Sequence, residues 1–348
     1  MEALRPRLLA SSLRPLRLRP CVRCLHTSPP NPATPIAHPT APGPPPPPPQ
    51  PEAYYDERLA RRKRQAALLQ KGGARPAEGG LQRRFWKNVS VREVEDGYQV
   101  LLDSRPVRTA EKKILVIPRN RPHLAAAIAL EWDQLVSAAQ ALKTAYVPLT
   151  GLAARAVDIR EADGRGDGEI REGITELMMR YLETDTLLCW AEGQEPEKDG
   201  RSLREMQVKE AERVVGDLTR TVWKGVDIRP VLEEGSIMPV KQAEETVEVI
   251  RGWIAALPAF ELAGLERAVL SGKSLLVAAR LVVEWSGEFE EVREKGVERF
   301  GIEEAVMACT CEVRWQTDLW GEVEDTHDVD REDLRRQFGS VVVLIHGE

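Results

Sequence analysis

The sequence contains VSVREVEDGYQVLL at residues 89–102, where hydrophobic and polar residues alternate on both sides of Asp96-Gly97. Alternation with a period of two is typical of a half-buried strand, and an Asp-Gly pair between two such runs favours a tight hairpin turn. The following Asp103-Ser-Arg-Pro106 is typical of a second turn, and Pro106 cannot donate a hydrogen bond within a central strand. We therefore predict a β-hairpin over residues 89–102.

An amphipathic helix is predicted to follow the strands. The run Ile114-Leu-Val-Ile117 has the length of a third strand, and Asn120 can cap the element after it. Hydrophobic residues then recur at spacings of four, four and three, at Leu124, Ile128, Trp132 and Leu135. Three strands followed by one helix indicate a small N-terminal α+β domain, which we place at residues 81–160.

The remainder of the chain has the hydrophobic period of helices and few strand signals. Pro258 and Gly272 mark boundaries between successive helices, and Asp330 can cap a short late helix. Residues 341–345 are a closing hydrophobic run that fits a strand or a buried tail. The predicted fold class is α+β, with a small N-terminal β-sheet/helix domain followed by an all-α orthogonal helical bundle at residues 161–348.

The first 51 residues differ in composition from the rest of the chain. They hold six arginines, no lysine and one acid, Glu2, whereas the remainder has a net charge of −11. An Arg-, Leu- and Ser-rich segment without further acids is typical of a mitochondrial transit peptide, which we predict at residues 1–28. Residues 29–51 are rich in proline and predict a disordered spacer. Residues 52–80 predict a basic helical lead-in and a Gly-rich linker.

The composition excludes several classes of protein. No run of about 18 uncharged hydrophobic residues occurs, so we expect no transmembrane segment. Five cysteines in 348 residues do not make a disulfide framework. The net charge of −11 after the N-terminal segments argues against a nucleic-acid partner.

The search for catalytic and ligand-binding motifs gives negative results. Gly272-Lys-Ser274 is similar to the end of a phosphate-binding loop, but the glycine required five residues earlier is Arg267, so a helix start is favoured. Cys309 and Cys311 have no second cysteine pair nearby, which disfavours a zinc site. None of the five histidines stands in a metal-ligand spacing. We predict no catalytic residue, no cofactor and no metal site.

Several ordered motifs resemble one known family. They are RFWKNV (84–89), GYQVLLDSRPVRT (97–109), AIALEWD (127–133), PLT (148–150), YLETDTLLC (181–189) and WGEVEDTHD (320–328). From about residue 83 to residue 345, the chain resembles the mitochondrial assembly chaperones for the α subunit of the ATP synthase catalytic head, in their fungal branch.

This resemblance implies a function. It implies a molecular chaperone that binds the free α subunit, prevents its aggregation and hands it to the β subunit during assembly. It also implies a location in the mitochondrial matrix, no catalytic turnover and no required cofactor. We expect the protein to be a monomer.

A late helix supplies the first candidate site for partner binding. Glu312, Gln316 and Trp320 recur every four residues, so they share one face of that helix. Glu324 and Asp328 continue just beyond it. These five side chains form either an acidic strip that binds the partner or a network that fixes the end of the helical bundle.

A second group lies on the helix that follows the strands. Trp132, flanked by Glu131 and Asp133, is either a structural residue packed beneath the sheet or between the domains, or a partner contact. We favour the structural role. Asp185 and Thr184 are expected to cap or brace a helix end.

Two other functions stay open. A metabolic enzyme of the mitochondrial matrix would carry a bound cofactor or show turnover in an assay. An accessory subunit of a respiratory complex would co-migrate with the mature complex, whereas a transient and substoichiometric association would favour a chaperone.

Overall fold

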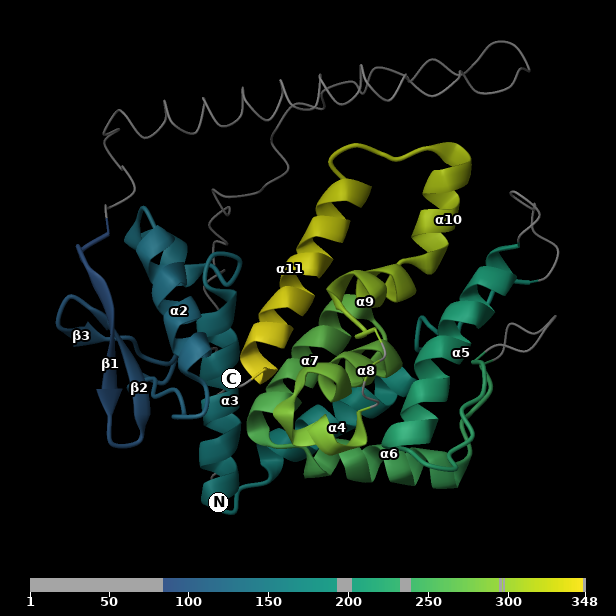
Figure 1. The fold of residues 1–348 in the computed structure, drawn as a ribbon, viewed down its shortest axis with the longest axis horizontal. Helices are drawn as coiled ribbons and strands as arrows, with labels where there is room; N and C mark the ends of the chain where they lie inside the picture. Colours follow the sequence, from purple (N-terminus) through teal and green to yellow (C-terminus); the bar gives the residue numbers. More distant parts are fainter. Residues whose placement is uncertain (1–83, 193–201, 232–238, 294–295, 297, 347–348) are drawn as a thin grey trace, which may run out of the picture. The chain divides into compact units, whose positions relative to one another are not determined.

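The computed structural model describes residues 84–192, 202–231, 239–293, 296 and 298–346 (Figure 1). The predicted transit peptide, Pro-rich spacer and basic lead-in lie outside these residues. The strands are β1 (Val89–Val94), β2 (Gly97–Leu102) and β3 (Arg105–Pro106). The helices, with η for 3-10 helices, are α2 (Pro122–Gln134), η1 (Ala138–Leu142), α3 (Pro148–Gly164), α4 (Glu169–Leu182), α5 (Leu203–Thr221), α6 (Glu244–Ala256), α7 (Ala259–Gly272), α8 (Leu275–Trp285), η2 (Gly287–Val292), α9 (Ile302–Cys309), α10 (Cys311–Trp320) and α11 (His327–Ile345).

The sheet is antiparallel, with β2 between β1 and β3. The predicted hairpin is confirmed, because Val94 of β1 pairs with Gly97 of β2. Its two turn residues are Glu95 and Asp96, one position earlier than the predicted Asp96-Gly97 pair, since Gly97 already belongs to β2. Gly97 has a φ of 146°, and a Cβ at this position would lie 1.9 Å from the carbonyl oxygen of Ile117. Only glycine fits both the backbone conformation and this close approach.

The prediction of a third strand at residues 114–117 is wrong. The third strand is β3, at the edge of the sheet where proline is tolerated. Ile117 instead forms an isolated bridge with Tyr98, in which the two residues exchange backbone hydrogen bonds of 2.7 and 2.8 Å. Pro118 follows at once, and because proline has no N–H group this pairing does not continue.

The helix predicted after the strands is confirmed as α2. It packs against β1 and β2 and buries Leu124 and Ile128. Asn120 does not cap it, because Arg121 is the N-cap residue and Pro122 takes the first helical position. Proline is favoured there, since its fixed φ suits the helix and the missing N–H group would have no helical partner.

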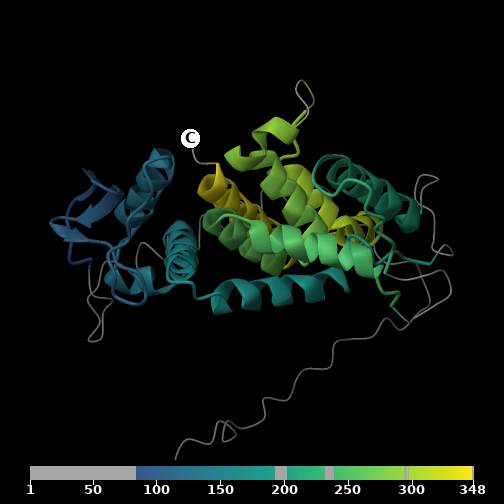
Figure 2. The same ribbon diagram turned by 90° about the horizontal axis from the view of Figure 1, so that it is seen from below.

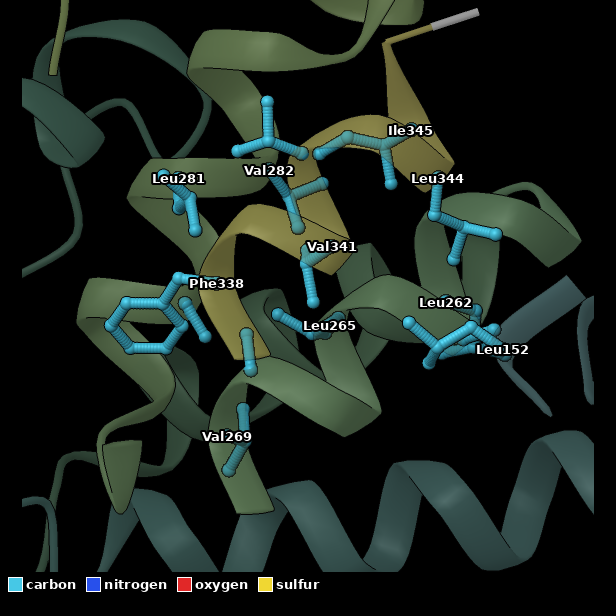
Figure 3. Close-up of a cluster of buried hydrophobic side chains, with 14 of the residues drawn as sticks. Leu152, Leu262, Leu265, Val269, Leu281, Val282, Phe338, Val341, Leu344 and Ile345 are labelled. Atoms are coloured by element: carbon cyan, nitrogen blue, oxygen red, sulfur yellow. The ribbon is translucent and has the colours of Figure 1, made fainter. Parts of the chain in front are cut away.

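The core of the helical part is formed around α7 and α8, most of whose residues are buried. Helix α7 packs against α3, α8 and α11. Both ribbon views show α11, in yellow, beside α7, in green (Figure 1, Figure 2). Figure 3 shows interlocking side chains from these helices, including Leu152, Leu262, Leu265, Val269, Leu281, Val282, Phe338, Val341, Leu344 and Ile345.

The C-terminal run, residues 341–345, is the end of α11 and not a strand. Asp330 lies in the first turn of this 19-residue helix, so it does not cap a short one. The β-branched residues suggested a strand, but packing against α7 overrides this propensity. The contact is close because Gly264 of α7 has no side chain: a Cβ there would lie 2.8 Å from Cγ2 of Ile345.

The predicted α+β class, with a small N-terminal sheet followed by helices, is confirmed. Helix α3 runs through the predicted domain boundary at residues 160 and 161. One hydrophobic cluster contains buried side chains from Trp86 to Ile345. The division into two domains stays a prediction. Within the described residues, no helix combines the length and the apolar character needed to span a membrane.

Candidate functional site

Helix α10 brings three of the predicted site residues together. Glu312, Gln316 and Trp320 lie on this helix, and the Nε2 group of Gln316 donates a 3.0 Å hydrogen bond to Oε1 of Glu312. Trp320 is the last residue of the helix, and 73% of its side chain is exposed. Its ring meets that of Trp315 edge-on, with 6.1 Å between the centroids. The three side chains therefore form one continuous surface that ends in an exposed indole.

The other two residues of the predicted strip lie beyond the end of α10. After Trp320 the chain turns at Gly321, which has a φ of 90°, and returns toward α11. Glu324 lies in this connection and is half-buried. Asp328 is the second residue of α11 and is only 4% exposed. An acid in the first turn stabilises a helix through its dipole. The structure therefore does not place Asp328 on the surface that Trp320 occupies.

The segment around these residues has an unusually high negative charge. Residues 311–333 comprise α10, the connecting loop and the beginning of α11, and we call this segment the acidic arch. It contains nine acidic side chains and two arginines, a net charge of −7. The arch also exposes Trp320, Val323 and Val329. A charged rim around exposed hydrophobic side chains is the usual composition of a protein-binding surface.

A groove of about 630 Å³ lies between the two helices of the acidic arch. Its α10 wall includes Val313 and Thr317, its α11 wall includes Asp330 and Leu334, and the end of α7 contributes to its lining. The sequence analysis missed this groove. Its only signal in the sequence is the helical spacing of its lining residues, and that spacing does not reveal which elements face one another.

The second predicted group, on α2, is held by contacts within the protein. The carboxylate of Glu131 accepts hydrogen bonds from the backbone N–H groups of Leu149 and Thr150, at 2.7 and 3.0 Å. These are N–H groups of the first turn of α3, which has no side-chain cap of its own. Burial raises the pKa of Glu131, although its hydrogen bonds act in the opposite direction. Glu131 therefore caps α3 from another helix.

Trp132 continues the same network. Its indole Nε1 donates a 3.0 Å hydrogen bond to Oγ1 of Thr150, and its carbonyl oxygen accepts one of 3.3 Å from the indole of Trp86. The Trp86 and Trp132 rings meet edge-on at 5.4 Å. Asp133 is exposed and lies 3.4 Å from the guanidinium of Arg84. These contacts favour the structural role for Trp132, with Asp133 at the surface.

Asp185 braces a helix start, as predicted. Its carboxylate is fully buried and accepts 3.0 Å hydrogen bonds from the N–H groups of Leu187 and Leu276. Burial raises its pKa to about 6, against the lowering effect of hydrogen bonds from Ser274 and neighbouring N–H groups. Ser274 is the N-cap of α8, which confirms the helix start predicted at Gly272-Lys-Ser274.

The described residues contain no cluster of His, Cys, Asp and Glu side chains that could hold a metal ion. The described residues do present the acidic arch, which combines exposed hydrophobic side chains, negative charge and a groove.

Comparison with known proteins identifies the family. The model of the ATP12 chaperone protein family matches residues 83–219. The chain is 31% identical over 267 residues to the mitochondrial protein atp12 of Schizosaccharomyces pombe, an alignment that covers 75% of this chain and 81% of the relative. The chain belongs to the ATP12 chaperone protein family. A second member, mitochondrial ATP12 of Saccharomyces cerevisiae, is 28% identical over 273 residues, which cover 75% of this chain and 82% of that protein.

Solved structures support the fold of this ATP12 family member. The crystal structure of Atp12 from Paracoccus denitrificans superposes with a TM-score of 0.56 at 22% identity, covering 76% of this chain and 98% of that one. The Atu1473 protein of Agrobacterium tumefaciens gives the same TM-score at 24% identity, covering 80% of this chain and 94% of the other.

Proposed function

We propose that this ATP12 family member is a mitochondrial matrix chaperone that binds the free α subunit of the ATP synthase catalytic head. It prevents aggregation of that subunit and hands it to the β subunit during assembly. Membership of the ATP12 chaperone family is the observation that carries this proposal. The resemblance of the sequence motifs to chaperones of the α subunit supports this client, and the Arg-rich N-terminal segment supports import into mitochondria.

The surface of the acidic arch fits the physical task of such a chaperone. An unassembled subunit of a ring exposes the hydrophobic surface that its neighbours will bury, and such surfaces aggregate. The chaperone must cover this surface and then lose it to the genuine neighbour. A small hydrophobic anchor within a charged rim suits that exchange, because the anchor supplies affinity and the rim supplies specificity. Trp320 is such an anchor, and Glu312 belongs to its rim.

The proposal includes no catalytic step. A matrix enzyme would convert a substrate, and an accessory subunit would remain with the mature complex. A substoichiometric association with assembly intermediates, absent from the mature complex, supports the chaperone. Stable co-migration with the mature complex contradicts it.

Co-expression with the client tests the proposal directly. The α subunit is produced in bacteria alone or together with the full chain, and its soluble and aggregated fractions are measured. We expect the chain to raise the soluble fraction and to be released when the β subunit is added. An α subunit that aggregates equally with and without the chain would show that the assigned client is wrong.

A further inference from the structure

The groove of the acidic arch has two walls with the same helical pattern. Its α10 wall includes residues 313, 314 and 317 with the N-cap residue Thr310, and its α11 wall includes residues 327, 330, 331 and 334 with Asp333 beside them. Both sets follow the spacing i, i+3, i+4, i+7, which is the stripe that one helix presents to a neighbouring helix. Figure 1 shows the loop that joins the end of α10 to the beginning of α11, and both helices contact α9. The groove is therefore lined on both sides by the kind of helix surface that usually packs against another helix.

The base of the groove is closely packed. Gly272 ends α7 at this base, and a Cβ there would lie 2.8 Å from both Sγ of Cys309 and Cζ of Phe338. Close-packed contacts of this kind do not compress. Above the base, Val313 and Leu270 stay partly exposed, with 40% and 37% of their surfaces accessible. The groove thus offers hydrophobic surface that the described residues leave partly uncovered.

The acidic side chains of the arch around the groove favour a cationic occupant at its rim. The lining itself holds His327 and three cationic side chains, and each of these three contacts an acceptor within the protein. Lys273 donates to the carbonyl oxygen of Leu270 at 2.5 Å, and Arg331 pairs with Glu322 at 2.9 Å. The third, Arg314, contacts the carbonyl oxygen of Met307 at 3.5 Å. Asp330 is exposed on the α11 wall, and the arch as a whole carries a net charge of −7.

The walls also select the conformation of the occupant. Both walls are helices, whose interior backbone groups are bonded within the helix. They offer no strand edge to an extended peptide, whose own N–H and C=O groups would enter the groove without main-chain partners. A helix satisfies its backbone internally and brings only side chains to the contact.

We propose that the groove of the acidic arch binds one amphipathic helix of the client, with hydrophobic side chains toward Val313 and Leu270 and basic side chains toward the acidic rim. The assignment of the client rests on the proposed function. The chemistry of the occupant, a helix with one hydrophobic and one basic face, rests on the groove. Residues 53–71 of this chain and a second copy of the chain are the alternative sources of a helix.

Substitutions on the walls of the groove test this inference. Val313→Lys places a cation among the hydrophobic contacts, and Asp330→Lys reverses one rim charge. Matched controls are Val249→Lys and Glu248→Lys on α6, because Val249 is 45% exposed and Glu248 is also exposed. We expect both groove variants to raise the Kd for the α subunit by at least about tenfold and the controls to leave it within about twofold. Circular dichroism and thermal unfolding check that each variant is folded.

A peptide probe separates the groove from the identity of the client. The probes are a synthetic amphipathic helix of leucine and lysine and the same peptide with glutamate in place of lysine, titrated by fluorescence anisotropy. The wild-type full chain is expected to prefer the lysine peptide, and Val313→Lys to remove that preference. Equal binding of the two peptides, or a preference unchanged in Val313→Lys, would overturn the inference even if the α subunit is the client. If the chain prefers the lysine peptide but does not bind the α subunit, the assignment of the client is wrong and the inference about the groove is supported.

A photoreactive amino acid at Thr317, within the groove, identifies the segment that enters it. The inference requires crosslinks to a basic amphipathic helix of the α subunit. Crosslinks to residues 53–71 of the same chain, or to a second copy, would show that the groove does not hold a helix of the client and would overturn the inference.

Discussion

The guanidinium group of Arg121 lies 2.8 Å from the carboxylate of Glu261, and both side chains are buried. Arg121 stands at the start of α2 and Glu261 in the first turn of α7. Arg121 also donates to the carbonyl oxygen of Leu344 at 2.5 Å, and Ser286 donates to Glu261 at 3.1 Å. One ion pair therefore connects the helix that covers the sheet to α7 and to the end of α11.

Loss of one partner of this pair is expected to be costly. Arg121→Met leaves the Glu261 carboxylate buried without its counter-ion, and we expect the free energy of unfolding to fall by about 3–5 kcal/mol. The double variant Arg121→Met, Glu261→Leu removes both charges and should recover most of that loss. Urea denaturation gives both values. A single variant as stable as the wild type, or a double variant no better than the single one, would contradict this account.

Asp185 makes stability depend on pH. Burial raises its pKa from the usual 3.8 to about 6. The folded protein therefore binds this proton more tightly than the unfolded chain, so the contribution of Asp185 to stability falls as the pH rises from about 4 to about 6. The fall is on the order of 3 kcal/mol. The stability of the wild type relative to Asp185→Asn, measured by urea denaturation across this range, should decrease as the pH rises. A difference that stays constant with pH would refute it.

Glu131 is expected to act on stability and not on the client. Glu131→Ala removes the acceptor for two N–H groups of α3, so the free energy of unfolding should fall by about 1–3 kcal/mol. Asp133→Ala, on the exposed side of the same helix, is the control and should change stability by less than about 0.5 kcal/mol. Both are measured by thermal or urea unfolding together with binding of the α subunit. If Glu131→Ala keeps its stability but loses binding, Glu131 is a partner contact and its structural assignment is wrong.

The sequence allowed prediction of those elements whose structure depends on residues adjacent in the chain. The hairpin of β1 and β2 and the periodic helix α2 are of this kind, since turn chemistry and hydrophobic spacing are both readable in one stretch of chain. Residues 341–345 were predicted as a strand or a buried tail, and they are the buried end of a helix. Their β-branched composition favours strands, whereas contacts with α7 hold them as a helix.

The candidate site depended on relationships that no local pattern contains. The spacing of Glu312, Gln316 and Trp320 correctly placed them on one helix face. Asp328 continues that spacing in the sequence, but the turn at Gly321 changes the chain direction and Asp328 is buried. The groove lies between α10 and α11, and the placement of these helices depends on how both pack on the rest of the fold.

Trp320 is expected to contribute to client binding and hardly to stability. With 73% of its surface exposed, its removal from the folded protein loses little buried area, so Trp320→Ala should change the free energy of unfolding by less than about 1 kcal/mol. A tryptophan that anchors an interface typically contributes about 2 kcal/mol or more to binding. We therefore expect the Kd for the α subunit to rise by more than about tenfold, measured by surface plasmon resonance or by solubility on co-expression.

Leu142 supplies the matched control for this experiment. It is 88% exposed and lies at the end of η1, outside the acidic arch. Because Leu142→Ala removes exposed hydrophobic surface elsewhere, it tests whether any exposed hydrophobic side chain promotes association with an aggregation-prone subunit. We expect it to bind the α subunit as the wild type does. Equal weakening by Leu142→Ala and Trp320→Ala would indicate nonspecific hydrophobic capture, whereas no weakening by Trp320→Ala would remove α10 from the binding surface. Loss of binding confined to Trp320→Ala would locate the anchor on the acidic arch.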